Sequence, residues 1–182
     1  VVAEGTEHPV ALDGLARVHR PDPLPAPRPV ANLRRLLTPS SAVVIGASAE
    51  TANPGRIILR NLARGGGIPQ DRIWALHPRA EEIDGCRAYA AMSSLPEVPD
   101  LAVVSVPADK GADRIVAEVV DRHLAHTVTL ITGGFAETEG GAEAERRRRE
   151  AVDRSHRRPD QGVLVNGGNC LGIRSVPGRY DT

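Results

Sequence analysis

The sequence predicts an α/β fold in which a doubly wound, mainly parallel sheet of five strands, or slightly more, carries helices on both faces. Short β-branched runs end abruptly at glycine or proline, as buried strands of parallel sheets do. Segments of helical periodicity separate these runs, so strand and helix alternate along most of the chain. Apolar residues make up 41% of the 182 residues, but the chain has one Phe, one Trp and two Tyr, so its core must be aliphatic.

The first part of the chain, residues 1–36, is predicted to be a proline-rich arm or linker ahead of a domain at residues 37–182. Alternate positions between residues 21 and 29 are proline, which is typical of an extended polyproline II segment. Residues 30–37 have the pattern of one or two helical turns that stop before Pro39. This arm is expected to be a linker or a strap on the domain. The alternative, a ligand for a proline-reading partner, stays open, but the arm lacks the aromatic or paired basic residues that would support it.

The first strand, at about residues 42–46, leads into the stretch around which the domain is organised. The small residues Gly46, Ala47 and Ser48 end it, and Asn53 precedes a helix at about residues 54–64. This order of strand, small-residue loop and helix start brings backbone N–H groups and the positive end of a helix dipole to a phosphate. We therefore predict a diphosphate-binding loop here.

The remaining elements alternate in the same way. They are strands at about residues 72–77, 101–106, 127–131 and 162–165, a helix whose apolar stripe runs from Ala112 to Leu124, and a helix at about residues 140–157. Asp109 is the predicted N-cap of the first of these helices. In the second, Glu143–Arg147 and Glu145–Arg149 are i,i+4 pairs, and we interpret the run of arginines from 146 to 149 as a solvated face rather than a phosphate or RNA site.

Ligands in such folds bind beyond the carboxyl ends of the strands. The five predicted strand ends are rich in glycine, proline and small polar residues, which allow the backbone to approach a ligand closely. These ends are Gly46-Ala47-Ser48, His77-Pro78-Arg79, Pro107-Ala108-Asp109, Thr132-Gly133-Gly134-Phe135 and Asn166-Gly167-Gly168-Asn169-Cys170.

Composition argues against several classes of partner. The 23 basic and 23 acidic groups cancel, and aromatic residues for base stacking are scarce, so we expect no nucleic-acid or membrane partner. Cys86 and Cys170 have no CxxC spacing, so we expect neither a disulfide framework nor a metal site. No run approaches the roughly 18 apolar residues of a membrane span and no signal peptide is visible, so we expect a cytoplasmic protein.

The tip of the second strand narrows the choice of nucleotide. A nicotinamide site would show a GxGxxG fingerprint and an acid about 20 residues further on. Here the two later glycine positions are Ser48 and Thr51, and the strand ends in His77, Pro78 and Arg79 instead of a carboxylate. An arginine there suits an additional phosphate monoester on the ribose. NADP and coenzyme A (CoA) both carry one, so both stay open at this point.

Six motifs follow one another at fixed spacing over roughly four-fifths of the chain. They are residues 37–48, Gly55 with residues 59–62, His77-Pro78 with residues 82–85, residues 99–108, residues 132–137 and residues 168–173. Together they resemble the CoA-binding domain of the NDP-forming acyl-CoA synthetases, relatives of the succinyl-CoA synthetase alpha subunit. The resemblance implies a Rossmann-like, nucleotide-binding domain that holds CoA across its strand ends.

The resemblance also implies a role for each strand end, without any catalytic residue in this chain. The diphosphate would meet the first loop and the following helix start, at Gly46, Ala47, Ser48, Asn53, Gly55 and Arg56. The second strand end would face the phosphate side of the nucleotide, at His77, Pro78 and Arg79. The nucleotide and pantetheine path would be lined by Val106, Pro107, Ala108, Thr132, Gly133 and Gly134, with Asn169 near the thiol.

The chain departs from the family in ways that limit the expected activity. The family has Asn-Pro where this chain has His77-Pro78, and Gly-Pro-Asn-Cys where it has Gly167-Gly168-Asn169-Cys170. The phosphorylated histidine of the family's second alpha domain and its ATP-grasp domain have no counterpart here. We therefore expect an excised domain of an acyl-CoA synthetase that contacts those other domains or subunits, through which alone ATP or another NTP would act. The isolated chain is expected to have no ligase turnover.

Two other functions remain as alternatives. A non-catalytic regulatory module on the same fold would bind CoA, acyl-CoA or NADP, and the segments encoded beyond residues 1 and 182 would distinguish it. An NADP-dependent oxidoreductase fits the second strand end, but the chain has no Tyr–Lys proton-donor pair, because Lys110 is its one lysine and both tyrosines are remote from it in sequence. The sequence leaves the acyl group, the nucleotide and the oligomeric state open.

Several side chains have two interpretations. His77 contacts a ligand or orders a turn, and Phe135 is a lid over the ligand or a plug beneath the loop. Cys170 is predicted to be buried and inert rather than active in thiol exchange. Glu137 is predicted to order its loop or to contact another domain. His123 and His126 are predicted to be partners of a helix C-terminus rather than metal ligands.

Overall fold

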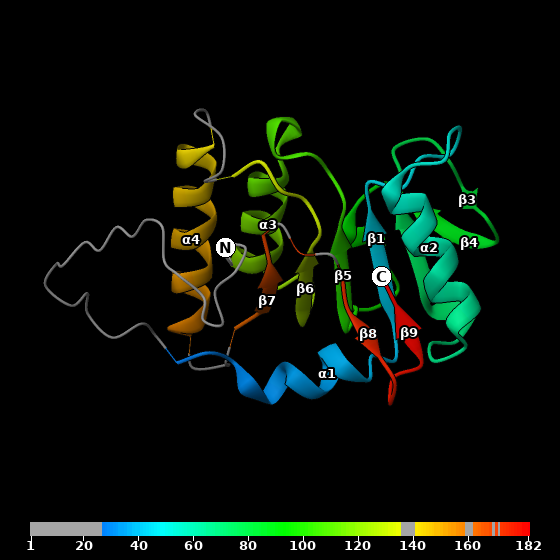
Figure 1. Cartoon of the computed structure of the whole chain (residues 1–182), viewed down its shortest axis with the longest axis horizontal. Coiled ribbons are helices and arrows are strands. Elements are labelled where there is room, and N and C mark those ends of the chain that lie inside the picture. Colours follow the sequence, from blue (N-terminus) through cyan, green and yellow to red (C-terminus); the bar gives the residue numbers. More distant parts are fainter. Residues whose placement is uncertain (1–26, 136–140, 159–161, 169, 171) are drawn as a thin grey trace, which may run out of the picture.

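The computed structural model describes residues 27–135, 141–158, 162–168, 170 and 172–182. Its main sheet has the strand order β3-β4-β2-β1-β5-β6-β7 (Figure 1). The strands are β1 (Ala42–Ile45), β2 (Ile73–Leu76), β3 (Glu82–Ile83), β4 (Cys86–Tyr89), β5 (Leu101–Val104), β6 (Thr127–Leu130) and β7 (Leu164–Gly167). All neighbours pair in parallel except β3 and β4. The predicted α/β class and its five parallel strands are confirmed, and β3 and β4 are the additional pair.

Helices cover both faces of this sheet. Helix α2 (Pro54–Gly65) lies on one face, together with a small hairpin of β8 (Arg174–Ser175) and β9 (Tyr180–Asp181). Helices α3 (Ala112–Asp121) and α4 (Ala142–His156) pack together on the other face (Figure 1). The alternation of side chains along each strand divides the core into two aliphatic layers, because successive strand residues point to opposite faces. Val44 and Val103 therefore meet α2, and Val43 and Val104 meet α3.

Both ends of helix α2 carry residues that are typical of helix termini. Asn53 caps its first turn, Pro54 occupies the first helical position, and Gly66 takes the left-handed conformation at its end (φ 68°). Its buried face carries Ile58, Leu59 and Leu62. The Asn53 cap therefore satisfies a backbone N–H that would otherwise lack a partner, and Gly66 lets the chain leave the helix.

The start of α3 differs from the prediction. Residues Ala108–Lys110 form a short 3-10 turn, η4, and α3 begins at Ala112 with Gly111 at the N-cap position (φ 95°). The prediction that Asp109 caps this helix is therefore wrong, because Asp109 lies within the turn that precedes it. The turn keeps residues 108–110 beside the end of β5 instead of continuing them into the helix.

The helical turns predicted at residues 30–37 are present as η1 (Val30–Asn32) and α1 (Leu33–Leu37). Figure 1 shows them at the end of the sheet opposite the top of α2. Leu36 is buried, and its carbonyl oxygen accepts a hydrogen bond from the Tyr180 hydroxyl. Arg35 pairs with Asp100 at 2.5 Å just before β5. The helical part of the predicted arm thus packs on the domain; residues 1–26 lie outside the described residues.

Candidate functional site

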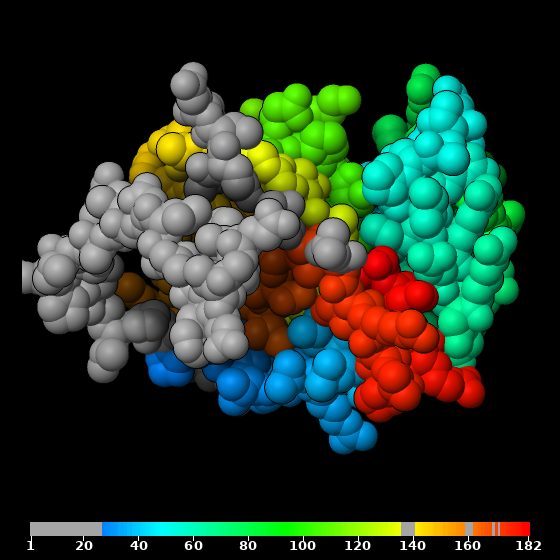
Figure 2. Space-filling view, viewed as in Figure 1, coloured from blue at the N-terminus to red at the C-terminus, as the bar shows by residue number. Residues whose placement is uncertain are grey.

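A cleft of about 780 Å³ opens where β1, β5 and β6 end. Its lining residues come from the β1–α2 loop, from η4 and from the segment after β6. They are Gly46, Asn53, Pro54, Ser105, Val106, Pro107, Ala108, Asp109, Lys110, Ile131, Thr132, Gly133 and Gly134. In the space-filling view, a notch separates the cyan surface of the β1–α2 segment from the green surface that follows β5 (Figure 2). The volume is within the range of small-molecule sites.

A larger hollow, of about 1020 Å³, lies at the β3–β4 edge of the sheet. Its lining includes the carboxylates of Asp71, Glu81 and Glu82 with Arg87 as the one cation. Three carboxylates disfavour a phosphate-bearing ligand through like-charge repulsion. The cleft at the ends of β1, β5 and β6 is therefore the candidate nucleotide site.

Eight of the sixteen predicted site residues line this cleft, and seven others in the described part of the chain do not. The eight that line it are Gly46, Asn53, Val106, Pro107, Ala108, Thr132, Gly133 and Gly134. Those in the described part of the chain that do not line it are Ala47, Ser48, Gly55, Arg56, His77, Pro78 and Arg79. Asn169 lies outside the described residues.

Two glycines allow the walls of the cleft to approach each other. Gly46 has a left-handed backbone (φ 102°), and a Cβ there would lie 2.8 Å from the Ser105 carbonyl oxygen. A Cβ at Gly55 would lie 2.6 Å from the Gly46 carbonyl oxygen. Because real Cβ atoms do not approach oxygen so closely, both positions need glycine to bring β1, β5 and α2 together. Gly55 therefore lets the start of α2 pack directly against the backbone of the β1–α2 loop.

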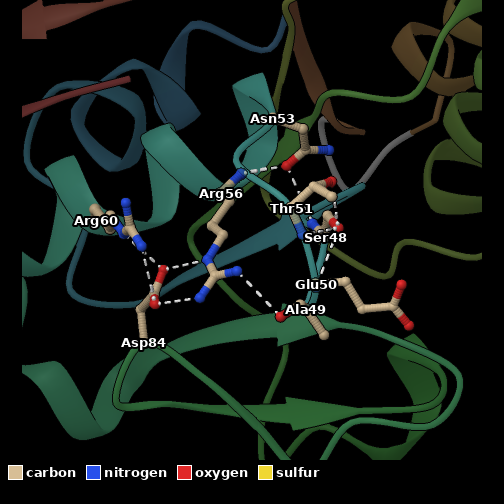
Figure 3. A network of polar contacts seen from close by, with 8 residues as sticks. All are labelled: Ser48, Ala49, Glu50, Thr51, Asn53, Arg56, Arg60 and Asp84. Carbon is tan, nitrogen blue, oxygen red and sulfur yellow. Dashed lines mark hydrogen bonds and ion pairs between the residues drawn. The ribbon is translucent and has the colours of Figure 1, made fainter.

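The β1–α2 loop is ordered by its own hydrogen bonds (Figure 3). Asn53 Oδ1 accepts from the N–H groups of Arg56 and Ser48, at 2.9 and 3.1 Å. Its amide nitrogen donates to the Gly46 carbonyl oxygen at 2.7 Å. The Ser48 hydroxyl accepts from the N–H groups of Glu50 and Thr51. The N–H groups of Ser48 and Arg56 are therefore engaged within the protein, and the loop is already shaped before a ligand arrives.

The guanidinium of Arg56 is held by Asp84 (Figure 3). Its Nε and Nη2 donate to the two carboxylate oxygens of Asp84 at 2.8 and 2.7 Å, and Nη1 donates to the Ala49 carbonyl oxygen. Arg60 also donates to Asp84, at 2.8 Å. Hydrogen bonds from Arg56 and then Arg60 hold the pKa of the Asp84 carboxyl well below its usual range. Arg56 thus joins α2 to the β3–β4 turn, and it does not line the cleft.

His77 orders the turn that follows β2. Its Nδ1 accepts hydrogen bonds from the backbone N–H groups of Ala80, at 2.9 Å, and Arg79, at 3.3 Å. Of its two interpretations, the structure shows the turn role. The side chain of Arg79 is exposed and lies outside the cleft lining.

The ends of β5 and β6 are joined by a hydrogen bond from the Thr132 hydroxyl to the Val106 carbonyl oxygen at 2.6 Å. Phe135 follows and is 2% exposed, so it is a plug beneath the loop rather than a lid. The guanidinium of Arg148 lies 5.7 Å from the centre of its ring. Arg148 is only 16% exposed and pairs with Glu145 at 2.7 Å. Glu137 lies outside the described residues.

The arginines at positions 146–149 of α4 differ in their exposure and in their contacts. The two i,i+4 pairs, Glu143–Arg147 and Glu145–Arg149, are confirmed. Arg149 is solvated, as predicted, but Arg148 packs on Phe135, and Arg147 also contacts Asp113. The interpretation as a solvated face is wrong at Arg148, which is 16% exposed, whereas Arg147 stays exposed beside its contact with Asp113. The pattern of charge alone does not reveal which residues face the loop after β6.

The two cysteines are free thiols. Cys86 is fully buried, and burial raises the pKa of its thiol to about 11. Cys170 is partly buried, and its Sγ accepts a hydrogen bond from the Gly172 N–H at 3.3 Å. Cys170 is therefore less buried than predicted, and its sulfur is held by the backbone that follows it.

Lys110 and Asp109 line the cleft but were not among the predicted site residues. One signal could have found them, since Lys110 is the one lysine of the chain and closely follows the predicted strand end at Pro107. Both histidines at the end of α3 lie outside the cleft lining, with ring centres 5.6 Å apart.

A Rossmann-like sheet with a cleft between strand ends at a helix start defines a nucleotide-binding domain. The family model of the CoA binding domain matches residues 40–175, and the chain belongs to this family. The resemblance found in the sequence is thereby confirmed.

Two curated relatives of this chain are ADP-forming acetate–CoA ligases. The chain is 31% identical to acetate–CoA ligase [ADP-forming] II of Archaeoglobus fulgidus, over 84% of this chain and 21% of the relative. It is 32% identical to the alpha subunit of acetate–CoA ligase [ADP-forming] II of Pyrococcus furiosus, over 76% of this chain and 28% of that subunit. The dinucleotide-forming acetyl-coenzyme A synthetase 1 of Ca. Korarchaeum cryptofilum superposes with a TM-score of 0.68 at 31% identity, over 82% of this chain and 30% of that one. The chain thus spans about a fifth to a third of these relatives.

Within the described residues, no helix is both long enough and apolar enough to span a membrane.

Proposed function

We propose that the cleft at the ends of β1, β5 and β6 holds CoA, and that the chain is the CoA-binding part of an acyl-CoA synthetase of the ADP-forming or another NDP-forming type. The observation that carries the proposal is the convergence of eight predicted site residues on one cleft beside the start of α2. The family match and the ligases named above support it. The acyl group is not specified by any of these observations.

The residues of the cleft suit the parts of this ligand. The loop at Gly46 and the start of α2 favour the diphosphate, because a helix start presents N–H groups and a positive dipole end. Among the described residues, no hydrogen bond within the protein engages the N–H groups of Ala47 and Gly55. Val106, Pro107 and Ala108 form an apolar wall for the pantetheine arm. Asn169 stays a prediction for the thiol end.

The chemistry of this chain is binding and placement. In the proposed reaction, the CoA thiol sulfur attacks an activated acyl group, its proton leaves, and the phosphate of the activated acid departs. No residue of the cleft is assigned to phosphoryl transfer. We propose that a phosphohistidine-bearing second alpha domain and an ATP-grasp domain, in the parent chain or a partner subunit, supply that activation with ATP or another NTP.

Calorimetric titration with CoA and NADP side by side tests the proposed ligand. We expect micromolar affinity for CoA and weaker binding of NADP; binding of NADP with no response to CoA would overturn the proposal. Gly133 is suited to a matched series, because it lines the cleft without a left-handed backbone. Gly133→Leu is expected to weaken CoA binding about tenfold or more by filling the cleft, and Gly133→Ala much less.

An activity assay tests whether this chain only binds and places CoA while other domains activate the acid. The isolated chain, given acid, ATP and CoA, is expected to form no acyl-CoA. Sustained formation of acyl-CoA by these 182 residues would contradict the proposal that other domains supply the activation of the acid. The segments encoded on either side of the chain distinguish a ligase from a non-catalytic CoA-responsive module, because only a ligase needs the two activating domains.

A further inference from the structure

We propose that Lys110 binds the diphosphate of CoA, from the wall of the cleft opposite the start of α2. This inference rests on the proposed function, since it assigns a partner to a ligand that the cleft is proposed to hold. Lys110 is the last residue of η4 and lines the same cleft as Gly46, Asn53 and Pro54. The β1–α2 loop and Lys110 therefore face one volume from two elements.

The other basic residues that the sequence suggested are placed elsewhere. The guanidinium of Arg56 is bound by both carboxylate oxygens of Asp84. Arg79 lies outside the cleft lining. Among the described residues that line the cleft, Lys110 is the one with a cationic side chain. No hydrogen bond or ion pair within the described part of the chain engages its ammonium group, which is exposed. A phosphate-bearing ligand in this cleft would therefore meet the ammonium group of Lys110.

The backbone fixes the place from which Lys110 acts. Its N–H donates to the Pro107 carbonyl oxygen at 3.0 Å, and the N–H of Gly111 donates to that of Ala108 at 3.2 Å. Gly111 then turns the chain in the left-handed region, so that α3 starts beyond the cleft. This turn holds Lys110 at the tip of β5. Its long, flexible stem and compact charge suit a phosphate contact that needs no bidentate geometry.

The diphosphate is a better match than the 3′-phosphate. The wall opposite Lys110 is the loop and helix start, where the helix dipole and the N–H groups without a hydrogen-bond partner among the described residues favour phosphate binding. In contrast, the tip of β2, where the resemblance puts the nucleotide's phosphate side, does not line the cleft. Asp109 also lines the cleft and repels the same anion, so Lys110 and Asp109 are expected to affect affinity in opposite directions.

The test compares CoA with 3′-dephospho-CoA by calorimetry at low ionic strength, using the full chain. Lys110→Gln is expected to weaken both ligands by about tenfold, because a charge-assisted hydrogen bond is lost. Lys110→Arg should stay within about threefold of the natural chain, and Asp109→Asn should bind both ligands more tightly. Arg114→Gln is the matched control: Arg114 is exposed on the first turn of α3 and lies outside the cleft lining, so a change below about twofold is expected.

Three results would overturn the inference alone. They are unchanged binding by Lys110→Gln, an equal loss in Arg114→Gln, and a loss that affects CoA but not 3′-dephospho-CoA. The last result would assign Lys110 to the 3′-phosphate. Failure of the natural chain to bind CoA would instead overturn the proposed function, and this inference with it. Because Lys110 is exposed, the variants are expected to keep the melting temperature of the natural chain, which is checked first.

Discussion

The guanidinium of Arg147 on α4 contacts the carboxylate of Asp113 on α3, with 2.7 Å between Nε and Oδ2. The Asp113 side chain is 3% exposed, whereas Arg147 is 46% exposed. Asp113 lies in the first turn of α3, where a negative charge also meets the positive end of the helix dipole. The pair thus joins two helices on the same face of the sheet, next to the turn that carries Lys110.

Removal of Arg147 is expected to destabilise the fold, because it leaves the buried Asp113 carboxylate without its cationic partner. We expect Arg147→Gln to lower the melting temperature by roughly 3–6 °C. Arg149→Gln is the matched control on the same helix, since Arg149 is 72% exposed and its pair with Glu145 is a surface contact. Equal effects of the two substitutions, measured by thermal unfolding, would show that the contact with Asp113 contributes nothing.

Asp84 is expected to make stability depend on acid pH. Its folded-state pKa is depressed, so its contribution is present above the ordinary carboxyl pKa of about 4 and is lost as the pH falls below that value. Asp84→Asn is a suitable change, because Asn tolerates the left-handed backbone found there (φ 49°). At pH 7 the variant should be less stable than the natural chain, and the difference should shrink between about pH 4 and pH 2.

Urea unfolding at several pH values measures this difference. Asp109→Asn serves as the control, because Asp109 is exposed and forms no ion pair with another described residue. A stability difference for Asp84→Asn that stays constant down to pH 2 would argue against the role of Arg56 and Arg60.

Five of the parallel strands could be predicted, because they are short runs made mostly of aliphatic and β-branched residues, and a glycine or proline lies at or shortly after the end of each run. Strand β4 was missed because Cys86–Tyr89 alternates between buried and exposed positions and has no β-branched residue. Its pairing with β3 depends on Asp84 and Gly85, both in the left-handed region, so the turn defines it more than the hydrophobic pattern does.

The strand-end residues that line the site could be predicted from the sequence, whereas the positions and partners of its charged side chains could not. Small residues at strand ends converge wherever a parallel sheet forms, so Gly46, Val106 and Thr132 could be placed together from the sequence. The partner of Arg56 could not, because Asp84 is 28 residues further on and reaches it only through the unpredicted β3–β4 turn. The position of Lys110 depends on where α3 begins, and the difference between a cap at Asp109 and one at Gly111 decides whether Lys110 lies in a helix or in the cleft.

Tyr180 joins the C-terminal hairpin to α1. Removal of its hydroxyl group by Tyr180→Phe is expected to lower the free energy of unfolding by a measurable amount. Its side chain is 2% exposed, and its hydroxyl donates to the Leu36 carbonyl oxygen. Tyr180→Phe should cost about 1 kcal/mol of unfolding free energy, because a buried carbonyl loses its partner. Burial raises the pKa of the hydroxyl to about 12, so the natural chain should lose stability as the pH rises from about 10 to 12, and the variant less. Tyr89→Phe, at a half-buried position, is the control.

Gly55→Ala separates helix propensity from packing at the candidate site. Gly55 lies in the first turn of α2, where an unconstrained change from glycine to alanine would stabilise by up to about 1 kcal/mol. The added Cβ would instead lie 2.6 Å from the Gly46 carbonyl oxygen and 2.8 Å from the Ala47 nitrogen. Because the obstacle is backbone, relief requires α2 to move from the loop, and overpacking of this kind costs about 1–3 kcal/mol. We expect a lower urea midpoint together with weaker CoA binding, since the displaced helix start would carry the diphosphate loop with it. A gain in stability, or a loss of stability with CoA affinity unchanged, would show that α2 and the loop are not packed as tightly as this contact requires.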